Sequence, residues 1–157
     1  MIASKNLTPR NINSGLTLIE LMIVMALIAI LATAIWGNFF TSLTKGRDSR
    51  RKQDLDAISK SIELYYNDNK SYPLPTLIQW GSPFTHPSNS AVVYMQKLPN
   101  DPTSPSASYC YYSDGSYYKI YSNLENTNDS KIIPTVACPP SSSKYYNYGI
   151  SSPNTTP

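Results

Sequence analysis

A long run without any charged side chain is the feature that most constrains this chain. It extends from Leu21 to Thr44, and its first part, residues 21–35, would be apolar on every side of a helix. At roughly 1.5 Å per residue, 24 helical residues reach about 36 Å, which is enough to cross the hydrocarbon core of a bilayer. A helix that is apolar all round must be buried in lipid or packed among other helices. We therefore expect residues 16–44 to form one hydrophobic helix, buried in one of these two ways.

The helical pattern continues beyond the charge-free run, but with only one apolar face. Apolar side chains recur at spacings of three and four residues, at Leu55, Ile58, Ile62 and Tyr65. The Tyr72-Pro73 step disfavours helical backbone at Tyr72. Residues 45–72 are thus predicted to be an amphipathic half of the same helix, which ends near Asn69.

The rest of the chain has a different composition and predicts a small β-rich head over residues 73–138. Two tyrosine-rich stretches, residues 109–112 and 117–121, flank Ser113-Asp114-Gly115-Ser116, which predicts a hairpin with glycine in the turn. Residues 73–90 contain four prolines and predict an irregular connection. Residues 91–98 form a short apolar element that fits either a strand or a helix. The fold class is α+β, with the long N-terminal helix packed on a small antiparallel sheet.

The end of the head and the tail give weaker signals. Residues 131–138 are compatible with an edge strand, which tolerates Pro134. Residues 139–157 predict a weakly ordered polar tail. Cys110 and Cys138 both follow the hydrophobic run, and an exported head would place them where thiols oxidise. One disulfide between them is the simplest expectation.

The first fifteen residues form a polar leader that differs from an ordinary signal peptide. They carry Lys5 and Arg10 and almost no apolar run, whereas the hydrophobic stretch of a signal peptide precedes its cleavage site. Here the hydrophobic stretch follows. A cut after Gly15 would therefore remove a leader and leave the hydrophobic helix on the product.

Glu20 requires an explanation, because a carboxylate inside an apolar helix is costly in lipid. Cleavage after Gly15 would create a cationic amine at Leu16, four positions before Glu20 and on the same helix face. Glu20 would then pair with its own terminus, or with that of a neighbouring subunit, which would fix the register between chains. The alternative is a carboxylate placed at a helix start by the macrodipole alone.

The stretch from Gly15 to Ala32, GLTLIELMIVMALIAILA, closely resembles the prepilin signature of type IV pilins and type II secretion pseudopilins. The resemblance implies that a prepilin peptidase cleaves between Gly15 and Leu16 and methylates the new amine. Family members commonly carry a proline midway along the apolar segment, where the helix loosens on assembly. Gly37 stands at the matching position, as a soft point or as a small residue for close helix contact.

The resemblance implies a structural subunit of a type IV pilus-like extracellular filament, polymerised through its N-terminal helix. Its partners would be identical or related subunits, the peptidase, an assembly ATPase with its membrane platform, and membrane lipid before assembly. The chain would span the cytoplasmic membrane once and then enter an extracellular or periplasmic filament with its head outside. The alternatives are a minor pilin or pseudopilin of a secretion or DNA-uptake machine, and a single-span anchor for a binding domain.

Other signals carry less weight. A basic cluster follows the charge-free run and predicts a solvated helix face or a headgroup contact, with a DNA-binding stripe as alternative: Lys45, Arg47, Arg50, Arg51 and Lys52. Oxygen-bearing side chains offer calcium ligands without a fixed loop pattern: Asp101, Asp114, Glu125, Asn128 and Asp129. We assign no metal or other cofactor. His86 is the only histidine, and no catalytic motif accompanies it, so we expect no enzyme.

Overall fold

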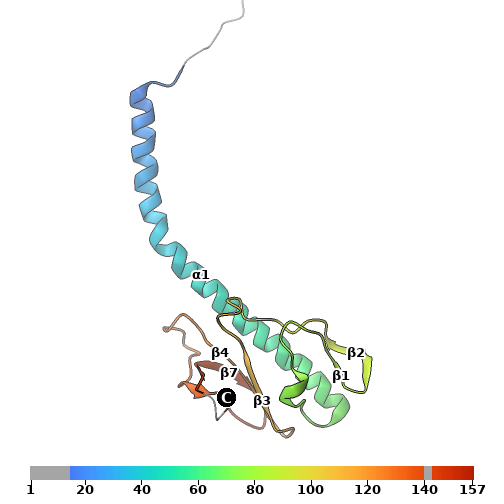
Figure 1. Ribbon diagram of the computed structural model, residues 1–157. Helices are drawn as coiled ribbons and strands as arrows, with labels where there is room; N and C mark the ends of the chain where they lie inside the picture. The colour runs from blue at the N-terminus through green and yellow to red at the C-terminus, as the bar shows by residue number, and fades with distance from the viewer. Residues whose placement is uncertain (1–14, 140–142) are drawn as a thin grey trace, which may run out of the picture. The chain divides into compact units, whose positions relative to one another are not determined.

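The computed structural model describes residues 15–139 and 143–157, and it leaves the side chains of residues 34–38 undescribed (Figure 1). Most of the expected leader, residues 1–14, therefore lies outside the described residues. The chain divides into two compact units, residues 1–40 and 41–157, which we describe separately. The elements in chain order are α1 (Leu18–Asn69), η1 (Pro75–Leu77), β1 (Phe84–His86), β2 (Asn89–Met95), β3 (Cys110–Ser113), β4 (Tyr118–Ser122), β5 (Val136–Ala137), β6 (Tyr145–Tyr146) and β7 (Tyr148–Ser151).

Helix α1 confirms the long helix predicted from the sequence. Its residues are mostly good helix formers, and no proline occurs between Pro9 and Pro73. The helix ends at Asn69, and the next residue, Lys70, turns into the left-handed region with φ 56°. The Lys70 backbone N–H still donates to the Tyr66 carbonyl at 2.8 Å, which closes the last turn. Among the described residues, the helices include none with the length and apolar character needed to span a bilayer.

The second unit has its core between the C-terminal part of α1 and a three-stranded antiparallel sheet (Figure 1). The strand order is β3-β4-β7, and the register pairs Tyr111 with Ile120 and Ile120 with Ile150. The predicted apolar face of the helix is confirmed, because Leu55, Ile58 and Ile62 have no exposed surface. The predicted hairpin is confirmed as well: β3 and β4 flank Gly115, whose φ of 93° suits glycine.

Tyrosine hydroxyl groups attach the second unit's sheet and loops to α1 and its following segment. The Tyr109 hydroxyl donates to Asp54 at 2.7 Å, and the Tyr118 hydroxyl shares a 2.7 Å hydrogen bond with Ser59. The Tyr111 hydroxyl donates to the Pro73 carbonyl at 2.7 Å. A tyrosine can thus bury its ring in the core while its hydroxyl group forms a hydrogen bond, which a phenylalanine lacks the group to form. This explains why the head is rich in tyrosine without requiring a ligand for these three rings.

The connection after α1 contains more regular structure than the sequence predicted. Residues 73–90 include η1 and β1, and the ambiguous element at 91–98 belongs largely to strand β2. Strands β1 and β2 form an antiparallel pair with irregular register. The β1 residue Phe84 is fully buried and stacks on Tyr65 of α1 with ring centroids 5.5 Å apart. This long-range packing holds the short strand in place.

The expectation of a weakly ordered tail is wrong for residues 145–151. Strand β7 is the third strand of the main sheet, and its Tyr148 is buried in the core of the second unit. Of the expected edge strand at 131–138, only β5 forms, and it pairs with β6. The composition of this segment did not reveal the strand, because Ser, Asn and Pro surround a short alternating stretch. Its inward side chains are stabilised by contacts with a sheet that is distant in the sequence.

A second, smaller apolar cluster covers the other face of the sheet. It contains Cys110, Tyr121, Cys138 and Tyr146. The disulfide expected between Cys110 and Cys138 is present, with Cα atoms 6.2 Å apart. Gly149 of β7 lies against the Tyr121 ring: a Cβ at this position would come within 2.6 Å of Tyr121 Cδ1. The missing side chain therefore lets the ring lie across the strand.

Candidate assembly site and charged junction

The start of α1 is fixed by a reciprocal pair of hydrogen bonds between Thr17 and Glu20. The Glu20 backbone N–H donates to Thr17 Oγ1 at 3.3 Å, and the Thr17 backbone N–H donates to Glu20 Oε2 at 2.9 Å. The Thr17 hydroxyl also donates to Oε2 at 2.9 Å. This is a capping box, in which two backbone donors at a helix start are satisfied by side chains three positions apart.

The capping box gives Glu20 a role that the sequence reasoning missed. The signal was present, because Thr17-Leu18-Ile19-Glu20 has the threonine-to-glutamate spacing of a capping box ahead of an apolar run. The two hydrogen bonds that the Glu20 carboxylate accepts both end on Oε2, so Oε1 takes no part in the cap. In the chain with its leader, Glu20 is thus bound to Thr17. A pairing with a new terminus at Leu16 stays a prediction.

Gly15 and Leu16 lie just before the helix, in irregular backbone. An added Cβ on Gly15 would meet no atom within 4 Å, and the Leu16 side chain is 79 % exposed. Described residues therefore do not cover the peptide bond between these two residues, and cleavage there stays a prediction. Gly37 lies inside α1 but among residues 34–38, outside the described side chains, so its expected softness stays a prediction.

The first turns of α1 expose apolar side chains in every direction. From Leu18 to Leu31, the large apolar side chains are between 47 % and 77 % exposed, with Val24 the least exposed and Leu18 the most. Such a surface is far larger than soluble monomers normally leave in contact with water. This stretch must therefore be covered by lipid or by other chains.

In the second unit, a network of charged side chains centres on Arg51 of α1. Arg51 donates through Nε to Asp101 Oδ2 at 2.8 Å and through Nη2 to Asp101 Oδ1 at 3.0 Å. Its Nη1 donates to Asp48 Oδ1 at 2.8 Å and to Glu125 Oε1 at 2.7 Å. Asp48 also accepts the backbone N–H groups of Glu125 and Asn126. The network ties the helix to two loops that are far away in the sequence.

The network shifts the titration of its carboxyl groups. Hydrogen bonds from Arg47 lower the pKa of Glu125; burial opposes this effect and Arg51 adds to it, with a resulting value of about 2. Burial raises the pKa of Asp101, but hydrogen bonds from Arg51 and Thr103 outweigh it and hold the pKa below its usual range. Both groups therefore stay ionised at any physiological pH.

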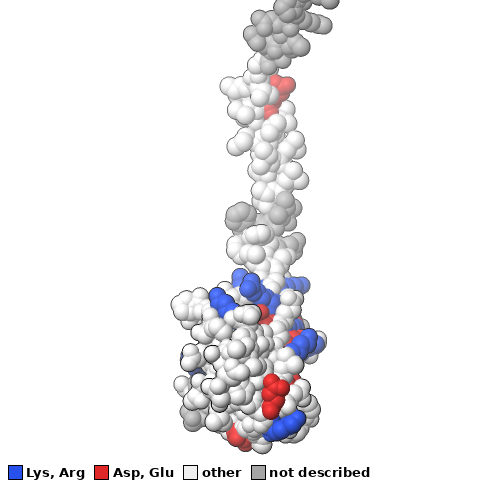
Figure 2. Space-filling model, turned by 90° about the vertical axis from the view of Figure 1, so that its right-hand side faces the viewer, with Lys and Arg blue, Asp and Glu red and all other residues white. Residues whose placement is uncertain are grey.

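The basic cluster is thus not simply a solvated face, and that prediction needs correction. Arg51 is 2 % exposed, Arg47 pairs with Glu125, and Lys52 pairs with Asp129. Figure 2 shows basic side chains gathered at one end of the second unit. These ion pairs also occupy three of the five suggested calcium ligands. In the described parts of the chain, no three His, Cys, Asp or Glu side chains are grouped to hold a metal ion.

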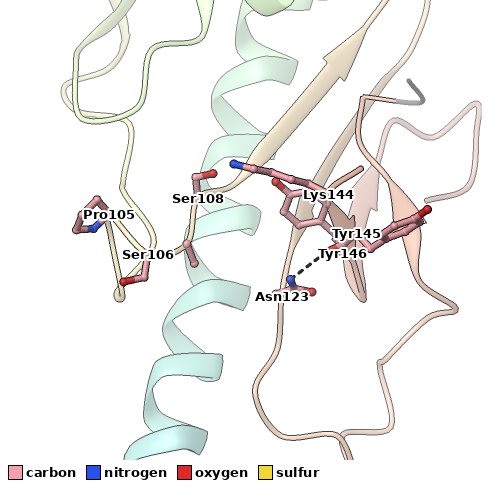
Figure 3. Close-up of a pocket in the computed structure, with 8 residues that line it drawn as sticks. Pro105, Ser106, Ser108, Asn123, Lys144, Tyr145 and Tyr146 are labelled. Atoms are coloured by element: carbon pink, nitrogen blue, oxygen red, sulfur yellow. Dashed lines mark hydrogen bonds between the residues drawn. The ribbon is translucent and has the colours of Figure 1, made fainter. Parts of the chain in front are cut away.

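Two of the hollows on the described part of the head are lined by tyrosine side chains. The first has about 270 Å³ and lies beside the loop of residues 105–108 and strand β6 (Figure 3), where Asn123 Nδ2 donates to the Tyr145 carbonyl at 3.0 Å. The second, which we call the tyrosine hollow, has about 260 Å³ and is lined by Tyr112, Tyr117, Lys119, Tyr121, Val136, Ala137 and Cys138.

Comparisons with known proteins match two consecutive stretches of the chain. Residues 10–36 match the family model of the prokaryotic N-terminal methylation motif, and residues 38–130 match that of type II secretion system protein G. The type II secretion system core protein G of Pseudomonas aeruginosa is 31 % identical over 99 residues, which cover 59 % of this chain and 70 % of the relative. The same protein of Dickeya chrysanthemi is 29 % identical over 112 residues, covering 68 % and 72 %.

A relative from a pilus matches a shorter stretch. The type IV wide pilus major component PilA4 of Thermus thermophilus is 41 % identical over 58 residues, which cover 37 % of this chain and 44 % of the relative. No solved structure matches the chain.

Proposed function

Because this chain belongs to the type II secretion system protein G family, we propose that it is a structural subunit of a type IV pilus-like filament. A prepilin peptidase would cut it between Gly15 and Leu16 and methylate the new amine, and the exposed start of α1 would then pack against other subunits. The observation that carries the proposal is the apolar surface from Leu18 to Leu31, which lies within the match to the N-terminal methylation motif. The subunit itself performs no catalysis.

The same surface suggests where the chain resides before assembly. A charge-free stretch of 24 residues, from Leu21 to Thr44, supports one passage through the cytoplasmic membrane. The head with its disulfide would lie outside the membrane and would become part of an extracellular or periplasmic filament. An assembly ATPase and a membrane platform would supply the work of extrusion, since the chain carries no phosphate-binding Gly-Lys motif.

We propose that Glu20 sets the axial register between neighbouring subunits, in addition to its role in the cap. Apolar helices gain little axial specificity from side-by-side packing in lipid. The Oε1 atom outside the cap would accept the methylated Leu16 amine of a neighbouring subunit. Removing one partner of a well-buried charge pair destabilises the structure by about 3 to 5 kcal/mol, because the other charge is left unpaired in an apolar setting.

A second candidate function is a minor pilin or pseudopilin of a secretion machine. The match of residues 38–130 to a secretion-system family favours it, whereas the PilA4 relative favours a pilus. A single-span anchor for a binding domain is less well supported, since an anchor needs neither a methylation motif nor an acidic residue in its apolar helix.

The test is filament yield in the native cell without a wild-type copy. Sheared filaments examined by electron microscopy should consist of subunits whose intact mass begins at Leu16 with one added methyl group. Glu20→Gln and Glu20→Ala should lower the yield at least tenfold and leave a leaderless, folded protein in the membrane. Arg50→Gln, which removes an exposed charge, should assemble normally. Normal filaments from both Glu20 variants would contradict the proposed role of the carboxylate.

A further inference from the structure

The tyrosine hollow lies on the face of the sheet that points away from the main core. Tyr112 of β3 pairs directly with Lys119 of β4, and side chains alternate between faces along a strand. Their sequence neighbours Tyr111 and Tyr118 are buried against the helix. Tyr112 and Lys119 therefore lie on the opposite face of the sheet, which they share with the buried Tyr121, and Tyr117 lies next to them.

Two of these rings stand partly open to solvent. Tyr112 and Tyr117 are half-buried, with ring centroids 6.0 Å apart and planes inclined by 49°. The hydroxyl groups of Tyr109, Tyr111 and Tyr118 bond to α1 or to the segment that follows it. Among the described residues, the hydroxyl groups of this pair form no such bond. The hydrogen bonds to α1 and its following segment therefore do not extend to this pair, whose two hydroxyl groups hydrogen-bond to each other.

Lys119 brings a positive charge to the hollow. None of the described carboxylates forms an ion pair with it. The neighbouring acid, Asp114, is held in the hairpin turn, where its Oδ1 accepts the backbone N–H groups of Ser116 and Tyr117. A ligand carboxylate would thus complete the polar contacts of the hollow.

The walls of the hollow are held rigidly. Tyr121 is 3 % exposed and stacks on Tyr146, with centroids 6.3 Å apart. The disulfide fixes Cys138, and with it the end of β5, to β3. A site that is already formed loses little entropy when a ligand binds.

We propose that the tyrosine hollow binds a single acidic sugar residue, such as a uronic acid, at the end or along the side of a glycan. The C–H faces of a pyranose ring would stack on Tyr112 and Tyr117. Hydroxyl groups of the sugar would hydrogen-bond to the phenol oxygens of these two tyrosines, and the sugar carboxylate would pair with Lys119. The volume of about 260 Å³ is below the range of about 300–1,000 Å³ usual for larger ligands, so one ring fits.

Single-stranded nucleic acid is the main competing occupant, because bases also stack on tyrosine. Binding a nucleic-acid strand requires several cations along its backbone. Residues 73–157 carry four lysines, no arginine and four acidic side chains, so their charges cancel. One isolated ammonium group among aromatic rings suits a compact anion better than a strand of phosphates.

The test uses the full-length chain in detergent micelles and two probes that differ at one carbon. Galacturonic acid and galactose share their ring hydroxyl arrangement and differ in whether C6 is a carboxylate or an alcohol. Saturation-transfer NMR and calorimetric titration should show saturable binding of galacturonic acid, at least tenfold tighter than that of galactose.

Variants then assign the binding to the hollow. Lys119→Gln should abolish the tenfold preference for the acid, and Tyr117→Ala should weaken both sugars. Lys131→Gln removes an exposed lysine elsewhere, and Tyr145→Ala removes an exposed tyrosine at the hollow beside β6; neither should change binding. Unchanged thermal midpoints would show that Lys119→Gln and Tyr117→Ala still fold.

Several results would overturn the proposal. Absence of galacturonic acid binding would do so, and so would binding that Lys119→Gln leaves intact. Oligoglutamate or oligothymidylate that binds more tightly, and that galacturonic acid does not displace, would show that the hollow takes a peptide or nucleic acid instead. None of these outcomes depends on filament formation, so the hollow can be tested whatever the outcome for assembly.

Discussion

Arg51 and Asp101, which lie 50 positions apart in the sequence, meet in a two-point ion pair that is almost completely buried. The two N–H···O distances are 2.8 and 3.0 Å, and each side chain is 2 % exposed. Asp101 also accepts the backbone N–H of Thr103 at 2.8 Å, so it holds its own loop as well. The pair therefore links the middle of α1 to the loop before β3.

Loss of one partner should be costly, because the other would stay charged and buried. We expect Asp101→Ala or Arg51→Ala to lower the free energy of unfolding of the head by about 3 to 5 kcal/mol. The double variant should lose less than the sum of the two, since neither charge is then left alone. Urea unfolding followed by tyrosine fluorescence measures these values.

Arg50→Ala provides the control for this pair, because Arg50 neighbours Arg51 on the helix but is exposed. Its effect should remain within about 0.5 kcal/mol. Equal losses from Arg50→Ala and Arg51→Ala would show that the buried network does not stabilise the head.

Acid should destabilise the head through Glu125. Its folded pKa of about 2 lies below its ordinary value of 4.5, so it contributes stability that is fully present above pH 4.5 and is lost as the pH falls toward 2. Glu125→Gln should lower the thermal midpoint at pH 7 and flatten its decline between pH 4.5 and 2. Asp56→Asn, at an exposed carboxylate on α1, should keep the wild-type slope. An unchanged slope in Glu125→Gln would contradict the role of Glu125.

Two glycines should respond in opposite directions to the same substitution. Gly149→Ala would force a Cβ to within 2.6 Å of the Tyr121 ring and 3.0 Å of the Ile120 carbonyl, and overpacking of this kind costs about 1 to 3 kcal/mol. Gly46→Ala meets no atom within 4 Å in α1 and should stabilise the head by up to about 1 kcal/mol. Thermal unfolding of both variants measures the difference, and a destabilised Gly46→Ala would remove the basis of the comparison.

Periodic, local signals in this sequence predicted the structure well. The extent and buried face of α1 followed from the spacing of Leu55, Ile58 and Ile62, and the β3–β4 hairpin followed from its Asp-Gly turn. Strands β1 and β7 could not be predicted, because each is at most four residues long and is held by contacts across the fold. The partners of Arg51 were equally hidden, since they lie 50 and 74 positions away.

The candidate assembly site shows a different limit of sequence reasoning. Glu20 was identified by its unfavourable position in an apolar helix, which directed attention to its charge. The neighbouring Thr17 carried an equally legible signal for a capping box, and the structure shows that cap. One residue can serve both purposes, so the two must be separated by substitution.

Thr17→Ala and Glu20→Gln should separate the cap from the charge. Thr17→Ala removes the capping hydroxyl, which typically costs about 0.5 to 2 kcal/mol of helix stability, but it keeps the carboxylate. Glutamine also serves in capping boxes, so Glu20→Gln keeps the cap and removes the charge. Amide hydrogen exchange at residues 18–21 should therefore accelerate in Thr17→Ala and change little in Glu20→Gln.

Filament yield should show the reverse order. If the carboxylate pairs with the Leu16 amine of a neighbouring subunit, Thr17→Ala should still assemble, at a reduced level, because ordering the helix start becomes part of the cost of assembly. Glu20→Gln should fail, because no charge remains to pair with that amine in an apolar setting. Abundant filaments from Glu20→Gln together with none from Thr17→Ala would mean that Glu20 serves assembly only by capping the helix.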